Sequence, residues 1–121
     1  MSIAVSLDEL RQRMEEFTTD AYLLTVRDDG RAHSVAVPVR WEDDTLVMPA
    51  GNTTAANAQA RPLVALLWPP PERGGYSLIV DATVVAAAEV EGGHEVTVRP
   101  TRAVLHRPAP SGQGNDCAPL L

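Results

Sequence analysis

Residues 21–41 read AYLLTVRDDGRAHSVAVPVRW, and this stretch decides the fold. Its first seven residues, which are mostly apolar, predict a buried strand, and Asp28-Asp29-Gly30 follows as a turn. An Asp-Gly pair suits a hairpin because hairpin turns need a positive φ, which glycine adopts without strain. The return segment, residues 31–41, alternates in polarity as a half-buried strand does. We therefore expect an antiparallel hairpin, with Pro38 marking an edge or a bulge because proline cannot donate to the ladder.

The segments on either side of this hairpin predict two helices and more strands. Ser6 and Glu9 form a capping box, and apolar residues then recur at helical spacing, which predicts a helix over residues 7–17. Residues 45–48 read as a third strand, and the Ala-rich residues 53–60 predict a two-turn helix capped by Asn52 or Thr53. Further strands are expected over residues 63–68, 76–91 (bent in the middle), 94–99 and 101–107.

This order of elements predicts a mainly β protein with short helices, of the α+β class. We expect a small barrel of six to seven strands, with an N-terminal helix and a short helix after the third strand. The 121 residues suit one domain. We assign residues 1–108 to it and interpret the Pro-, Gly- and Ser-rich residues 109–121 as a flexible C-terminal tail.

The charged residues exclude several functions. All ten basic residues are arginine, and sixteen acidic residues bring the net charge to −6. Without lysine the chain has neither the phosphate-binding lysine of a P-loop nor a Schiff-base amine. Nucleic-acid affinity comes mostly from neutralising phosphates, so an acidic chain argues against nucleic acid as a partner.

The cysteine and histidine content argues against disulfides and metal sites. Cys117, in the predicted tail, is the single cysteine, and the three histidines lack the spacing of metal ligands. We expect His94, after Gly92-Gly93, to be a solvated turn residue. The N-terminus lacks signal-peptide features, and no stretch approaches the roughly 20 apolar residues of a membrane span. The expected location is therefore cytoplasmic, with no membrane partner.

Four segments, in this order, resemble the FMN-binding split-barrel superfamily, the pyridoxamine 5′-phosphate oxidase-like proteins. They are residues 22–33 (YLLTVRDDGRAH), 51–66 (GNTTAANAQARPLVAL), 76–83 (YSLIVDAT) and 99–104 (RPTRAV). The match covers roughly residues 6–108 and refines the expected fold to a split β-barrel.

The resemblance implies a homodimeric flavoprotein oxidoreductase that acts on a small organic substrate. FMN, or alternatively an 8-hydroxy-5-deazaflavin coenzyme, would lie between protomers, with its phosphate at the start of the short helix, where free amides favour an anion. Neither catalytic residues nor a substrate are indicated. The implied cofactor contacts are Ser34, Ala36, Pro38, Arg40, Gly51, Asn52, Thr53, Thr54, Asn57, Arg61 and Trp68.

The chain departs from the superfamily at the phosphate motif, which is Gly-[Ser/Thr]-x-Lys-x-x-Asn. Asn52 stands at the hydroxyl position and Thr54 at the lysine position. Charge-assisted hydrogen bonds are about twice as strong as neutral ones, so this loss should cost on the order of 1–2 kcal/mol of affinity. Arg40, Arg61 or an arginine of the partner chain would have to replace the lysine. The alternative is a cofactor-poor paralogue that binds a small ligand, with haem held by His106 or His33 as one possibility.

Overall fold

The predicted hairpin is present in the computed structural model, which describes residues 1–109. Strand β2 (Ala21–Val26) pairs antiparallel with β3 (Ala32–Val37), and Gly30 has a φ of 86° in the turn between them. The predicted tail and Cys117 lie outside the described residues, except for residue 109. The other elements are β1 (Ser2–Val5), α1 (Leu7–Met14), β4 (Arg40–Glu42), β5 (Thr45–Ala50), α2 (Asn52–Ala60), β6 (Leu63–Trp68), β7 (Ser77–Val90) and β8 (Gly93–His106).

The strands form one curled sheet in the order β3-β2-β6-β7-β8-β5-β4, and β1 pairs with β8. The edge strands β3 and β4 are separated in the sequence only by Pro38 and Val39. The chain therefore ties the two edges of the sheet together, which requires the sheet to curl. No ladder joins β3 to β4 or β5 among residues 1–109, so the barrel stays split along that side. The fold class is confirmed.

Three predicted boundaries and the predicted number of strands differ from the structure. Residues 31–41 are two strands, because Pro38 has no N–H to continue the ladder. Residues 93–106 are one strand, which passes through Pro100 beside a register shift in its pairing with β7. Helix α1 ends at Met14 rather than at residue 17. The described residues contain eight strands because β1, which has no strong local signal, adds to β8.

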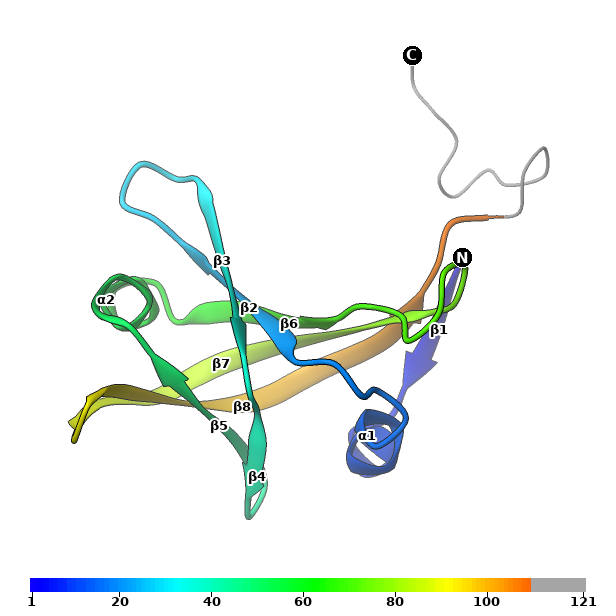
Figure 1. Cartoon of the computed structure of the whole chain (residues 1–121), viewed down its shortest axis with the longest axis horizontal. Helices are drawn as coiled ribbons and strands as arrows, with labels where there is room; N and C mark the ends of the chain where they lie inside the picture. The colour runs from blue at the N-terminus through cyan, green and yellow to red at the C-terminus, as the bar shows by residue number, and fades with distance from the viewer. Residues whose placement is uncertain (110–121) are drawn as a thin grey trace.

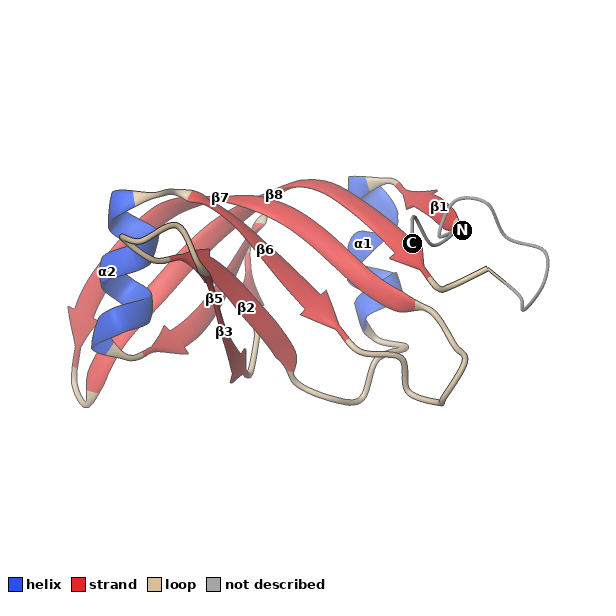
Figure 2. Cartoon of the chain, turned by 90° about the horizontal axis from the view of Figure 1, so that it is seen from above, coloured by secondary structure: helices blue, strands red, loops and turns tan. Residues whose placement is uncertain are grey.

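The core lies inside the curled sheet, and each helix covers one end of it. Figure 2 shows α2 at one end, α1 and β1 toward the other, and the long curved strands β7 and β8 running between them. Leu10 of α1 is fully buried, and the capping box is present, with Glu9 N–H donating to Ser6 Oγ at 3.3 Å and Ser6 Oγ–H donating to the Glu9 carboxylate at 2.8 Å. The described helices are too short and polar to span a membrane.

Helix α2 packs against the sheet through short side chains, which let it lie close to the strands. Its buried residues are Thr54, Ala55, Asn57 and Ala58. Such short side chains allow the helix axis to approach β7, β8 and β2, which are its neighbours in Figure 1. The first turn of α2 consequently lies beside β3, the end of β5 and the β7–β8 hairpin, where a cavity opens.

Candidate functional site

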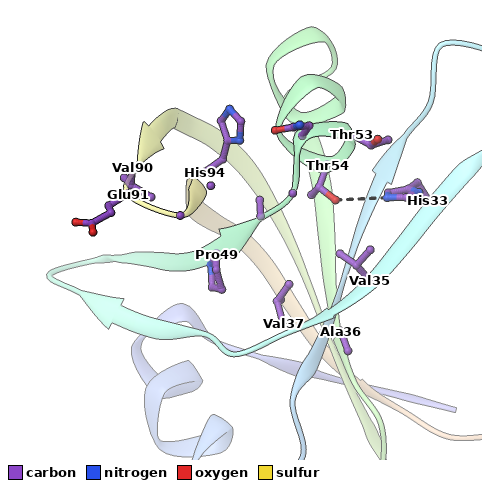
Figure 3. A pocket seen from close by; sticks show the side chains of 15 residues that line it. His33, Val35, Ala36, Val37, Pro49, Thr53, Thr54, Val90, Glu91 and His94 are labelled. Carbon is purple, nitrogen blue, oxygen red and sulfur yellow. Dashed lines mark hydrogen bonds between the residues drawn. The ribbon is translucent and has the colours of Figure 1, made fainter.

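A cavity of 610 Å³ opens at the start of α2. Three segments that are distant in sequence form its wall (Figure 3). The lining residues are His33, Val35, Ala36 and Val37 of β3, Pro49 to Thr54 from the end of β5 and the first turn of α2, and Val90 to His94 of the β7–β8 hairpin. One side is thus apolar and the other is rich in hydrogen-bond donors.

The donor side is the amino end of α2. Its N-cap is Gly51 rather than the predicted Asn52 or Thr53, and no side chain caps the helix. The first helical hydrogen bond runs from the Ala55 N–H to the Gly51 carbonyl at 3.0 Å. The amides of residues 52–54 precede that bond and have no carbonyl within the helix to receive them. Together with the helix dipole, they make this end of the cavity suited to an anion.

His33 contacts this turn from the opposite wall. Its Nε2 lies 3.4 Å from the Oγ1 of Thr54, a hydrogen bond whose direction depends on the protonation state of the ring. Thr54 is only 3% exposed and occupies the position of the superfamily's lysine. Thr54, which stands where the resemblance predicts a lysine, is therefore hydrogen-bonded to a histidine (Figure 3).

The expectation that His94 is a solvated turn residue is wrong. It lies in β8, paired with Glu89 of β7 and Ala50 of β5, and its ring is labelled at the cavity wall in Figure 3. Its Nδ1 is buried and has no hydrogen-bond partner among the described residues. Leaving such an atom unpaired costs on the order of 1–3 kcal/mol. The ring therefore keeps a hydrogen-bonding capacity that the protein itself does not use.

Sequence alternation contained the signal for both histidines. His33 shares a face with Val35 and Val37, and the exposure of β3 alternates so that this face points inward. His94 likewise shares the inward face of its strand with the fully buried Val96 and Val98. The face of β3 that was expected to contact the cofactor is the opposite one, with Ser34 and Ala36, followed by Pro38 after the strand ends. On that face Ala36 lines the cavity, whereas Ser34 and Pro38 are exposed and do not line it.

The two candidate arginines are not at the cavity. Arg40 donates to the Glu95 carboxylate at 3.0 Å, and this hydrogen bond raises the pKa of Arg40. Arg61 donates to the Val26 carbonyl and the Asp28 carboxylate, both at 2.7 Å. Arg61 follows the last turn of α2, on the order of 15 Å along the helix from its amino end. Neither arginine is among the lining residues, so the structure does not bring the predicted replacements to the phosphate end.

Two other predicted contact residues lie inside the protein. Asn57, 6% exposed, donates from Nδ2 to the Oγ1 of Thr25 on β2 at 3.2 Å, which anchors α2 to the sheet. Trp68 is 4% exposed and belongs to the hydrophobic core. Of the predicted contacts, Ala36, Gly51, Asn52, Thr53 and Thr54 line the cavity.

The lining residues fit a flavin with a phosphate. The free amides, the Thr53 and Thr54 hydroxyls and the Asn52 amide are the donors that phosphate oxygens accept. A Cβ built on Gly51 would meet no atom within 4 Å, so the backbone there is open to a close approach. The apolar wall from β3, with Pro49 and Val90, offers a surface for a ring system. The mismatch is charge, because no arginine lines this cavity.

Comparison with solved structures agrees with this fold. The chain superposes on an F420 reductase (TM-score 0.63, 20% identity, 76% of this chain and 94% of that chain) and on an FMN-binding protein of Syntrophomonas wolfei (0.65, 11%, 85% and 87%). It also superposes on the haem storage protein HutZ of Vibrio cholerae (0.60, 14%, 80% and 91%). The chain therefore has the split-barrel fold that the resemblance predicted.

Sequence comparison identifies two relatives of this split-barrel protein. It is 42% identical over 106 residues to the uncharacterized proteins Mb0449c of Mycobacterium bovis and MT0457 of Mycobacterium tuberculosis. The match covers 74% of this chain and 71% of each relative, and the chain belongs to the same family as these two proteins. No protein-family model matches the chain.

Proposed function

We propose that this split-barrel protein is a small homodimeric oxidoreductase that binds FMN in the 610 Å³ cavity at the start of α2. The observation that carries the proposal is the uncapped amino end of α2, which faces an apolar wall across the cavity. A deazaflavin coenzyme is the alternative cofactor, and the expected location is cytoplasmic. When bound, either cofactor supplies hydride or electron transfer to a small organic substrate, and the protein binds and orients it.

Each part of the cavity has a distinct task in this proposal. The amides of residues 52–54 and the two threonine hydroxyls hold the phosphate. Val35, Val37 and Pro49 contact the ring system and exclude water from one of its faces. The open backbone at Gly51 lets the phosphate approach the helix closely, since a side chain there would occupy the same space.

The outward face of β2 and β6 supports the homodimer. The inward residues of both strands form the core, yet their outward residues are also apolar: Tyr22, Leu24, Val26, Leu63, Ala65 and Leu67. Leu63 is 74% exposed and Tyr22 42%. Strands that are apolar on both faces are typical of sheets covered on both sides. A second copy of the chain, with the same apolar face, is the cover we propose.

Two measurements test the proposal. Purified protein is titrated with FMN, FAD, a deazaflavin coenzyme and haem, and absorbance and flavin fluorescence are followed. Quenching by FMN, with an absorption band retained after gel filtration, supports flavin binding, whereas indifference to all flavins overturns it. Sedimentation equilibrium should give a dimer, and Leu63→Arg should shift it toward monomer. A wild-type monomer contradicts the proposed assembly.

The second candidate is a ligand-binding protein without redox activity. The observation that favours it is the lack of arginine in the cavity lining, which weakens a flavin phosphate site. Haem is the ligand to test first, because His33 offers an imidazole at the cavity wall. A sharp band near 400 nm on adding haem, with no response to flavins, would favour this candidate over the first.

A further inference from the structure

The cavity lacks an arginine but has two imidazoles on its wall, one on each side of the α2 amino end. His33 comes from β3 and His94 from β8 (Figure 3). We propose that His33 and His94 supply the positive charge for a phosphate in this cavity, so that the anion is held at low pH and released as pH rises. The inference rests on the proposed flavin site and names the groups that replace its missing cation.

His33 acts through Thr54. When His33 is neutral with its proton on Nδ1, its Nε2 accepts the Thr54 hydroxyl hydrogen across 3.4 Å. When His33 is protonated, Nε2–H donates to Thr54 Oγ1 instead, and the hydroxyl hydrogen is free to turn into the cavity. Protonation therefore adds a positive charge and releases one further hydrogen-bond donor at the position where the superfamily has lysine.

His94 provides the second charge from the hairpin side. His94 is one of the residues that line the cavity, and its Nδ1 is buried without a partner among residues 1–109. Protonation makes the ring a cation with two N–H donors. An imidazole on this wall and one on the β3 wall can therefore both attract an anion held by the helix amides between them.

The charged groups around the two histidines are few. Beside His94, the ladder places Glu89 on β7, the hairpin contributes Glu91, and the next residue of β8 is Glu95, which is paired with Arg40 at 3.0 Å. Figure 3 shows the Glu91 side chain directed away from His33 and Thr54.

The neighbours of His33 carry no charge. It lies opposite Thr25 of β2 in the ladder and contacts Thr54 of α2, and β5 contributes Pro49 and Ala50 to the same cavity. Neither the threonines nor these β5 residues carry an ionisable side chain, so His33 is the ionisable group on this side of the cavity among the described lining residues.

The direction of the pH dependence distinguishes this site from one built on arginine. The ordinary pKa of histidine is about 6.5, and the second pKa of a phosphate monoester is about 6. Between about pH 7 and 8.5, the FMN phosphate is therefore almost wholly dianionic, while a histidine that the bound phosphate keeps protonated at pH 7 loses its proton. An arginine site keeps its charge throughout, so its affinity does not fall.

The first experiment uses inorganic phosphate and the full-length protein. The ring signals of the three histidines are followed by NMR across a pH titration, with phosphate or with chloride at equal ionic strength. His106 is the internal control, because its Nδ1 lies 3.2 Å from Ser2 Oγ and it is not among the cavity residues. Phosphate should raise the titration midpoints of His33 and His94 and leave His106 unchanged. An equal response of all three histidines, or no response, overturns the proposal.

The second experiment compares FMN with riboflavin, which lacks the phosphate. The ratio of their affinities should fall about tenfold between about pH 7 and 8.5, because the two histidines that the bound phosphate keeps protonated at pH 7 lose their charge there. His33→Gln and His94→Gln should lower the ratio at pH 7 and weaken its pH dependence. Thr54→Val should remove the part of this pH dependence that comes from His33. Thr54→Ser keeps a hydroxyl and should retain that part.

The two experiments separate this inference from the proposed function. If phosphate moves the two midpoints but no flavin binds, the flavin function fails and the histidine site stands. If FMN binds more tightly than riboflavin by a ratio that does not change with pH, the flavin function stands and the histidine proposal is overturned.

Discussion

The buried hydrogen bond between Asn57 and Thr25 should carry much of the attachment of α2 to the sheet. Asn57 Nδ2 donates to Thr25 Oγ1 at 3.2 Å, and the two side chains are 6% and 1% exposed. Thr25→Val keeps the shape of the side chain and removes the acceptor. A buried amide then loses its partner, which costs about 1–3 kcal/mol of unfolding free energy. At about 4 °C per kcal/mol for a chain of this size, Tm should fall by about 4–12 °C.

Thermal and urea unfolding, followed by circular dichroism, measure this loss. Thr101→Val is the matched control, because Thr101 is exposed and its hydroxyl donates to the Asp81 carbonyl at the surface. We expect the control to change stability by no more than about 0.5 kcal/mol. The double variant Thr25→Val/Asn57→Leu should lose less than the sum of its two single variants, since neither polar partner then remains unpaired. A Tm for Thr25→Val within about 2 °C of wild type, or equal to that of the control, would refute the reasoning.

Three further substitutions test the cavity, the helix cap and the core. Gly51→Val should leave Tm unchanged, because its φ of −79° suits valine and its Cβ meets open space, but it should weaken FMN binding at least about tenfold, or 1.4 kcal/mol, in a fluorescence titration. Ser6→Ala should lower the unfolding free energy by about 0.5–2 kcal/mol in urea, since the Glu9 amide loses its side-chain acceptor and the Glu9 carboxylate loses the Ser6 hydroxyl; an unchanged midpoint would contradict a role for the cap. Leu10→Ala should cost about 2–5 kcal/mol by the same assay, whereas Leu7→Ala, at a position 47% exposed, should cost far less. Equal losses at these two positions would contradict the burial of α1.

Local sequence signals predicted the elements whose causes are local. The Asp-Gly turn with Gly30 at positive φ, the capping box at Ser6 and the apolar run of β6 each depend on neighbouring residues. The bend expected in residues 76–91 corresponds to the register shifts of β7 near Asp81 and Val84. The fold class followed from the order of these elements.

Long-range pairing produced the errors in the predicted strands. Strand β1 is a strand because residues 2–5 find partners at residues 103–106, a hundred positions away. Residues 93–106 stay one strand because β7 pairs with them along their whole length, which holds the chain extended through Pro100, while β5 pairs with residues 94–98 of the same strand. A single-sequence pattern contains neither partner, so it could not predict either result.

In the candidate site, too, local sequence predicted some features and long-range pairing produced the others. The segment from Gly51 to Thr54 was predicted through the resemblance, and it lines the cavity. Arg40 and Arg61 were expected near it, but their carboxylate partners hold them elsewhere. The alternation around His33 and His94 indicated an inward face, yet only the folded sheet brings these two faces to one cavity.

The sequence by itself determined the types of the main elements, the hairpin, the capping box at Ser6 and the absence of lysine, because turns, caps and composition are local properties. The tertiary structure decided which side chains share the cavity. The curl of the sheet places β3, α2 and the β7–β8 hairpin together, although they lie as far apart in sequence as His33 and His94. Side chains meet there because distant strands pair, and the charge available to an anion is therefore a property of the fold.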